Sequence, residues 1–197
     1  ISAYFDNKKF KIKYTFYDTS INIEESPFAA LEAVLNIDEN NLSSEEVLAL
    51  LNYKNLREKF EISEDLSLVR KAVNVANIRL GEDGDSNVET NTISWNYGLK
   101  RLIYGFCLPD DTGLVSIANE DFYPVDEFEG SQRLDLIRLN TFYEQLVEFL
   151  LKTKNSRTLK EWIGFLENAI DNFLKTSDYD FSYFFSLLNS IALTQEL

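Results

Sequence analysis

Apolar residues recur along most of this chain at spacings of three and four, which is the period of one face of an α-helix. The clearest case follows Ser63, which we predict to be the N-cap of a helix. A polar loop over residues 81–87 ends that helix, and a second helix is predicted from about Thr92 to Cys107. The expected apolar stripes are Leu66, Val69, Val73 and Ala76 in the first helix, and Ile93, Leu99, Leu102, Ile103 and Phe106 in the second. We expect the rest of the chain to be arranged around these two helices.

Further helices are predicted from the same spacing and from residues that cap helix starts. Ser43 with Glu46, and Thr158 with Glu161, have the spacing of a capping box. Ser26, which precedes Pro27, and Asp180 are also expected to be N-caps. The helices are expected at about 27–36, from 44, at 54–60, at 131–152, from 159 and from 181. In the 131–152 helix the buried side chains are expected to be Leu134, Ile137, Phe142, Leu146, Phe149 and Leu150.

Three segments lack this helical period. Residues 8–17 alternate lysine and apolar side chains, which predicts a half-exposed strand near the N-terminus. Its lysines could follow a nucleic-acid backbone, but a solvated strand face is favoured. Residues 114–117 are typical of a short strand, and the acidic, aromatic residues 119–130 of an ordered loop. With 7 Gly and 3 Pro in 197 residues, the predicted class is mainly α with a short N-terminal strand.

The composition limits the kinds of partner that the chain can bind and the compartment in which it is expected. The formal charge is −14, so the surface as a whole repels phosphate backbones and any contact with nucleic acid must be local. The single cysteine, Cys107, lies in an apolar helix pattern and is expected to be a buried small hydrophobe in a reducing cytoplasm. No apolar run is long enough to cross a bilayer, and the absence of methionine suggests a piece of a longer protein, expected to be monomeric.

Several kinds of catalytic site are missing from the sequence. Histidine is absent, which removes the usual general base and a common metal ligand, and no phosphate-binding loop of the GxxxxGK type occurs. The acids at 82–85 resemble part of a calcium loop without its full ligand spacing. Asp126, Glu127 and Glu129 could belong to a nuclease, but one loop does not supply acids from separate elements. We therefore predict no catalytic residue, metal ligand or cofactor.

One cluster could contact DNA. Tyr97, Lys100, Arg101 and Tyr104 follow each other at spacings of three and four, so rings and cations share one helix face, and Trp95 precedes them. Such a face can stack on an unpaired base while holding its phosphate. The alternative is that Trp95 and Tyr104 are core rings with a polar tip.

Four segments in order carry a family resemblance. They are NLREKFEISEDL at 55–66, ANIRLGEDGD at 76–85, ISWNYGLKRLIYGF at 93–106 and FYPVDEFEG at 122–130. Over about residues 15–175 the chain resembles RecC, the gamma chain of exodeoxyribonuclease V. Leu80 stands where that family has tryptophan, whereas the aromatic-Gly-Leu core of residues 97–99 is kept.

The resemblance implies an inactivated superfamily 1 helicase. Residues 1–22 would lead out of a RecA-like domain of the 2A type, and residues 23–197 would form the helical 2B-like domain. The family partners RecB-like and RecD-like subunits in double-strand-break repair and recombination, where it guides DNA strands and reads a hotspot. The loop with Asp126 and Glu127 would then lie toward the DNA and take part in strand recognition.

Two other function classes stay open at this stage. A stand-alone helical domain could use its acidic surface to bind a basic protein partner. A small carboxylate-metal hydrolase would show metal-dependent turnover that is lost on replacing Asp83 or Asp126. If the chain is instead a RecC-like domain, we expect no enzyme activity in the isolated chain. We also expect weak, strongly salt-dependent binding to single-stranded DNA.

Overall fold

In the computed structural model, residues 23–84, 90–108, 112–117, 119–176 and 181–195 are described. The predicted strand at 8–17 and the cap at Asp180 lie outside them. Mainly helical structure is confirmed. The elements are η1 Ile23–Glu25, α2 Pro27–Leu35, α3 Ser44–Leu50, α4 Lys54–Lys59, α5 Ser67–Val75, η3 Thr90–Ile93, α6 Trp95–Cys107, β1 Val115–Ile117, β2 Glu120–Phe122, α7 Gln132–Thr153, α8 Leu159–Phe173 and α9 Ser182–Gln195.

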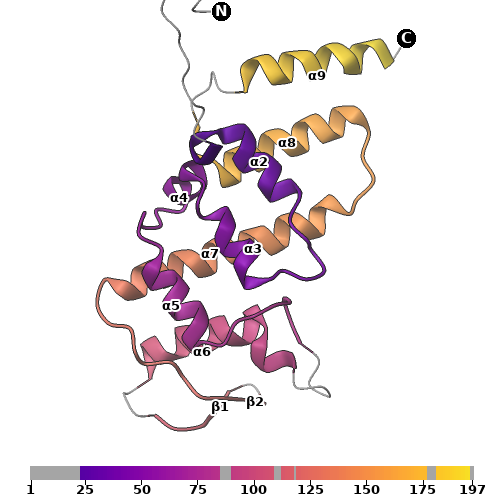
Figure 1. The fold of residues 1–197 in the computed structure, drawn as a ribbon. Helices are drawn as coiled ribbons and strands as arrows, with labels where there is room; N and C mark the ends of the chain where they lie inside the picture. Colours follow the sequence, from indigo (N-terminus) through magenta and orange to yellow (C-terminus); the bar gives the residue numbers. More distant parts are fainter. Residues whose placement is uncertain (1–22, 85–89, 109–111, 118, 177–180, 196–197) are drawn as a thin grey trace, which may run out of the picture.

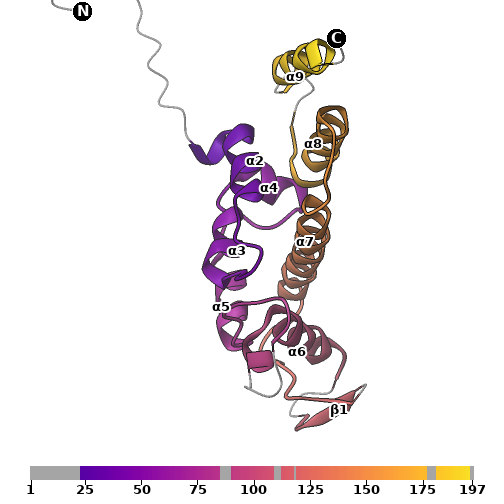
Figure 2. The same ribbon diagram turned by 90° about the vertical axis from the view of Figure 1, so that its right-hand side faces the viewer.

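The helices form two layers, seen edge-on in Figure 2. The short helices α2 to α5 make one layer, and α7 with α8 makes the other. The layers meet where α5 packs on α7 and where α2 and α4 pack on α8. Helix α6 and the two short strands close one end of the molecule, and α9 lies beyond α8 at the other (Figure 1). Within the described residues, no helix combines the length and the apolar character needed to cross a bilayer.

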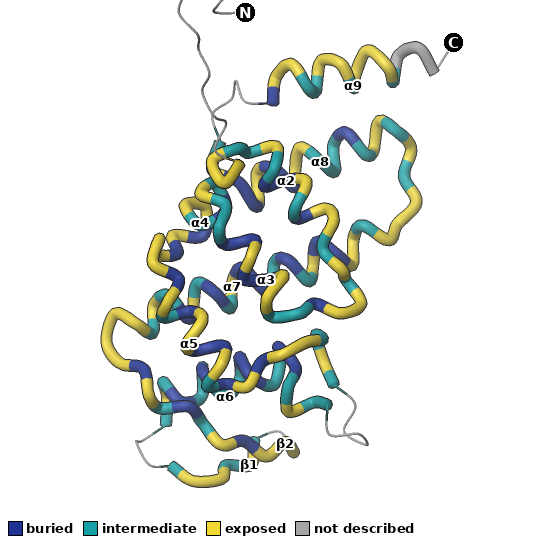
Figure 3. The backbone as a smooth tube through the Cα atoms, in the orientation of Figure 1, coloured by how far each residue is buried: buried dark blue, intermediate teal, exposed yellow. Residues whose placement is uncertain are grey.

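Buried residues recur along the helices of both layers (Figure 3) and form one hydrophobic core. Aromatic rings are prominent in this core. The Phe60 and Phe142 rings meet edge to face at 5.1 Å between the layers, and the Phe149 and Phe173 rings meet at 5.2 Å between α7 and α8. Burying such rings supplies much of the driving force for folding. The burial of Phe142 and Phe149 confirms the prediction made for the second half of α7.

The predicted face of α7 is wrong in its first half. Leu134 and Ile137 are 49% and 46% exposed, while Leu136, Leu139 and Tyr143 are buried. Apolar residues stand on two overlapping stripes there, and periodicity alone cannot select one of them. The stripe containing Leu136 is buried because α5 and α6 both pack on α7.

Helix starts follow the predicted caps in most cases. The Oγ atoms of Ser26 and Ser43 accept the N–H groups of Ala29 and Glu46. Helix α6 begins at Trp95 rather than at the predicted Thr92, because residues 90–93 form the separate 3₁₀ helix η3 and the Oγ of Ser94 accepts the Tyr97 N–H. Ser63 is the exception, because α5 begins at Ser67 and has Leu66 at its N-cap position. The Asp65 carboxylate accepts the Ser67 N–H at 2.9 Å, so this acid makes the local turn before α5.

Two smaller predictions are corrected at the end of α6. Part of the 119–130 segment is a strand, since β2 pairs antiparallel with β1 and Val115 lies opposite Phe122. The turn between the strands has Asn119 at φ 66°, a backbone conformation that asparagine tolerates well. Cys107 is exposed, because it is the last residue of α6 and lies off the face that carries Leu102 and Gly105.

The capping box at the start of α8 leads to a pH-dependent prediction. The N–H and hydroxyl of Thr158 donate to the Glu161 carboxylate at 2.8 Å each, and these bonds hold the pKa of Glu161 below its usual 4.5. A carboxyl group whose pKa is lower in the folded state than in the unfolded state stabilises the fold at pH values above its unfolded-state pKa. This contribution disappears as the pH falls through the folded-state pKa. We expect Glu161→Gln to destabilise the protein at pH 7 and to have little effect near pH 3. Urea unfolding at both pH values measures this, and an equal loss at both would contradict it.

Candidate functional site

Trp95, the first residue of α6, is a core side chain. It is 0% exposed, and its Nε1–H donates to the Leu42 carbonyl at 2.8 Å. Its ring stacks on that of Tyr143 with centroids 4.7 Å apart and planes 16° from parallel. The indole thus ties α6 to α7 and to the turn before α3. In this arrangement its ring is not accessible to a base.

Two glycines on α6 let other parts of the chain approach the helix closely. A Cβ at Gly98 would overlap the side chain of Ile78, and a Cβ at Gly105 would overlap the backbone carbonyl of Val125. These glycines are seven residues apart, so they share one face of α6. The segments after α5 and after β2 therefore lie against this face at its two ends.

Arg101 lies between the two glycines and joins both segments. Its Nε donates to the Tyr123 carbonyl at 2.7 Å, and its Nη1 donates to the Ala76 carbonyl at 3.0 Å. The Val125 N–H in turn donates to the Arg101 carbonyl at 3.0 Å. A planar guanidinium with several fixed donors suits such a bridge between two backbones.

The other predicted contact residues of α6 lie against β2. The Tyr97 hydroxyl donates to the Asp121 carbonyl at 3.0 Å, and the rings of Tyr97 and Tyr104 both meet the buried ring of Phe122 at 5.3 Å. Lys100 forms a 2.7 Å ion pair with Glu120, and the bond to this carboxylate is the main cause that raises the pKa of Lys100. The rings and cations do share one face, as predicted, and this face carries the short sheet.

The predicted acidic residues lie on the loop after β2. Glu127 forms a 3.2 Å ion pair with Lys71 of α5, with both side chains about half exposed. Asp126 is half-buried and has polar interactions of its own. In the loop before α6, the Asp83 carboxylate accepts the Asn96 side-chain N–H at 2.9 Å. Among the residues that the structure describes, no three His, Cys, Asp or Glu side chains gather in a way that could hold a metal ion.

Three important residues were missed by the sequence analysis. Gly98 and Gly105 were noted only as letters of a motif, although two glycines seven apart inside an apolar helix are a signal for close backbone approach. Tyr143 was not predicted to be buried because it precedes the polar Glu144 and lies outside the predicted stripe.

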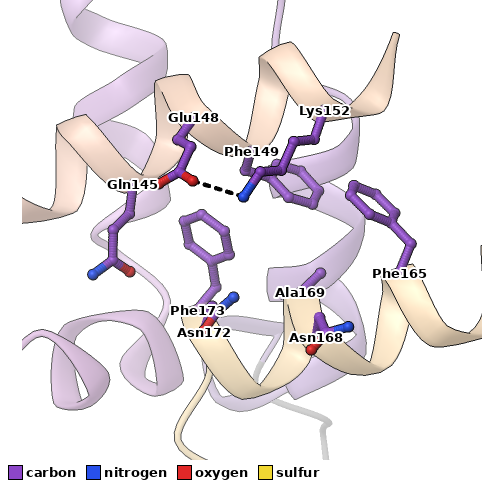
Figure 4. A pocket seen from close by; sticks show the side chains of 9 residues that line it. All are labelled: Gln145, Glu148, Phe149, Lys152, Phe165, Asn168, Ala169, Asn172 and Phe173. Carbon is purple, nitrogen blue, oxygen red and sulfur yellow. Dashed lines mark hydrogen bonds and ion pairs between the residues drawn. The ribbon is translucent and has the colours of Figure 1, made fainter. Parts of the chain in front are cut away.

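A separate pocket of about 420 Å³ lies between α7 and α8 (Figure 4). The rings of Phe149 and Phe165 stack at 5.1 Å at one side of it, and a 2.6 Å ion pair between Glu148 and Lys152 crosses its edge. Asn168 and Asn172 on α8 add amide groups. None of these residues was predicted as a site. The pocket combines ring faces with amides at its rim.

Comparison with known proteins gives consistent matches. The model of a family described as "RecBCD enzyme subunit RecC fourth domain" matches residues 24–196. A protein of Haemophilus influenzae named "RecBCD enzyme subunit RecC" is 26% identical over 191 residues, covering 92% of this chain and 16% of the relative. The protein of that name from Escherichia coli is 26% identical over 168 residues, covering 82% of this chain and 15% of the relative. The chain thus spans about a sixth of the length of these relatives.

Proposed function

This chain belongs to the RecC fourth-domain family, and we propose that it is a non-catalytic domain of a RecC-like subunit of an exodeoxyribonuclease V enzyme. In this role it would act in double-strand-break repair and recombination by holding subunits together and guiding DNA strands. The observation that carries the proposal is the family match over residues 24–196. RecB-like and RecD-like subunits are the proposed partners, in the cytoplasm.

The packing of α6 supports a scaffolding role. Its indole, guanidinium and phenol groups are bonded to Leu42, Ala76, Asp121 and Tyr123, which belong to three separate segments of the chain. Each bond is made to a backbone carbonyl, so each fixes the path of a segment rather than the position of one side chain. A domain connected in this way presents a fixed surface to its neighbours.

Strand guidance would depend on groups that remain accessible on this end of the molecule. The Lys100 side chain is 43% exposed although it is paired with Glu120, and Tyr123 is 60% exposed. Accessible cations can bind the phosphates of an unpaired strand, and accessible rings can stack on its bases. With a net charge of −14, affinity for DNA is expected to be weak and strongly salt-dependent.

Fluorescence anisotropy with labelled single-stranded DNA at several salt concentrations tests this contact. Lys100→Gln is expected to weaken binding and to reduce the slope of log K against log salt by about one. Lys152→Gln is a matched control, because Lys152 also forms an ion pair with a glutamate, at 2.6 Å, and its side chain is 57% exposed. Equal effects of the two substitutions, or no binding at low salt, would contradict the proposed guidance.

A second experiment tests the assembly and the absence of catalysis. In the full-length subunit, charge reversal at Lys100 is expected to leave co-elution with the RecB-like and RecD-like subunits intact while impairing unwinding.

The purified chain is expected to show no magnesium-dependent cleavage of DNA. Cleavage that disappears in Asp83→Asn or Asp126→Asn would instead establish the hydrolase alternative.

A further inference from the structure

We propose that the pocket between α6 and α7 is a binding site for a guanidinium group, the arginine side chain of a protein partner. The key observation is Tyr143, whose side chain lines this pocket and is 1% exposed. Its hydroxyl is the one buried side-chain polar atom without a hydrogen-bond partner in the described part of the chain. Buried polar groups are rarely left unpaired, because the loss of hydration is then uncompensated.

The pocket is large enough for more than a single water molecule. Its volume is about 260 Å³, well above the roughly 30 Å³ that one water occupies in the liquid. Leu99, Ile103 and Tyr104 of α6 form a mainly apolar wall. This wall suits the CH₂ stem and the flat faces of a weakly hydrated group.

Residues that carry hydrogen-bond acceptors line the pocket from both helices. The Asn140 Nδ2 donates to Glu144 Oε1 at 2.9 Å, which leaves Asn140 Oδ1 as an acceptor on α7. The Asn96 Nδ2 donates to Asp83, which leaves Asn96 Oδ1 as an acceptor on α6. With the second oxygen of Glu144, these atoms match a planar group that has several N–H donors. The Tyr143 hydroxyl is closed to solvent in this structure, so it joins these acceptors when the pocket opens toward it.

The charges around the hydroxyl favour a cation. Burial raises the pKa of Tyr143, and the nearby carboxylates of Glu82 and Asp83 raise it further, so the phenol stays neutral. Glu144 adds a third negative charge at the rim. Among the described residues that line the pocket, Lys100 is the one cation, and Glu120 pairs with it at 2.7 Å. The net charge of −14 also favours a basic protein partner.

The inference can be tested on the 197-residue chain with a Trp162→Phe background. Trp95 is then the single tryptophan, and its stacking on Tyr143 makes its fluorescence a reporter of the pocket. The probe is acetyl-arginine amide, and the comparison compound is acetyl-citrulline amide, a neutral isostere. We expect saturable binding of the arginine compound with a millimolar Kd, at least tenfold tighter than that of the citrulline compound. Equal binding, or no saturation, would overturn the proposal.

Variants locate the site. Tyr143→Phe and Glu144→Gln are each expected to weaken arginine binding at least fivefold. Glu148→Gln, one helical turn further along α7, is the matched control and is expected to change the Kd less than twofold. If Glu148→Gln has the same effect as Glu144→Gln, the binding is non-specific attraction to the acidic surface and the proposal is overturned.

Two further readouts separate the proposed occupant from other contents of the pocket. Tyr143→Phe is expected to raise Tm by about 2–4 °C without ligand, because it removes an unpaired buried hydroxyl. A lower Tm would show that the hydroxyl already has a partner.

A short Gly-Ser peptide with one central arginine is expected to bind at least as tightly as acetyl-arginine amide. Binding of the amide alone would exclude a protein side chain as the occupant. Neither readout involves DNA, so both are independent of strand guidance.

Discussion

Replacing Gly105 by alanine is expected to destabilise the protein by about 2–4 kcal/mol. The added Cβ would overlap the carbonyl of Val125, which is a backbone atom and has no alternative rotamer. Relieving the overlap requires the loop after β2 to move away from α6. That movement would lengthen the hydrogen bonds from the Val125 N–H to the Arg101 carbonyl and from Arg101 to the Tyr123 carbonyl.

Urea unfolding of Gly105→Ala and Gly164→Ala measures this effect with an internal control. Gly164 lies inside α8, and a Cβ there would meet no atom within 4 Å. Alanine at this position is expected to stabilise the protein by about 0.5–1 kcal/mol through helix propensity alone. The opposite signs separate close packing from a general effect of glycine in a helix. A Gly105→Ala variant as stable as the wild type would show that the loop does not lie against α6.

Replacing Trp95 by alanine is expected to cost about 3–5 kcal/mol, the range for removing a large buried aromatic side chain. The substitution removes the stacking on Tyr143 and leaves the Leu42 carbonyl without the indole N–H. Trp95→Phe retains a ring and loses the hydrogen bond, so we expect an intermediate loss of about 1–3 kcal/mol.

Thermal or urea unfolding followed by circular dichroism measures both variants. DNA binding provides the complementary readout: at temperatures where Trp95→Phe is folded, its affinity for single-stranded DNA is expected to equal that of the wild type. If Trp95→Phe were as stable as the wild type but no longer bound DNA, Trp95 would be a base-stacking residue instead of a core side chain.

The sequence predicted the helical elements well because their signals are local. The caps at Ser26, Ser43 and Thr158 depend on residues three positions apart, and the structure places a helix start after each one. Failures arose where the outcome depends on what packs nearby. Leu134 and Leu136 are equally apolar, and only the positions of α5 and α6 decide that Leu136 is buried.

The candidate site was likewise predicted only where its signals are local in sequence. The spacing of Tyr97, Lys100, Arg101 and Tyr104 correctly places rings and cations on one face of α6. Their partners are distant in sequence, since Arg101 bonds to Ala76 and Tyr123 and Lys100 pairs with Glu120. Such contacts are set by the tertiary arrangement, and a helical period contains no information about them.

Helix α6 and the two segments docked on it are expected to form a single rigid unit. Native-state hydrogen exchange tests it most directly at three amides: Leu102 inside α6, Arg79, whose N–H donates to the Ile93 carbonyl at 2.8 Å, and Val125, whose N–H donates to the Arg101 carbonyl at 3.0 Å. If the unit opens cooperatively, these amides exchange with the same opening free energy and the same denaturant dependence. Exchange of Arg79 or Val125 that is a hundredfold or more faster than that of Leu102, after correction for intrinsic rates, would contradict the account.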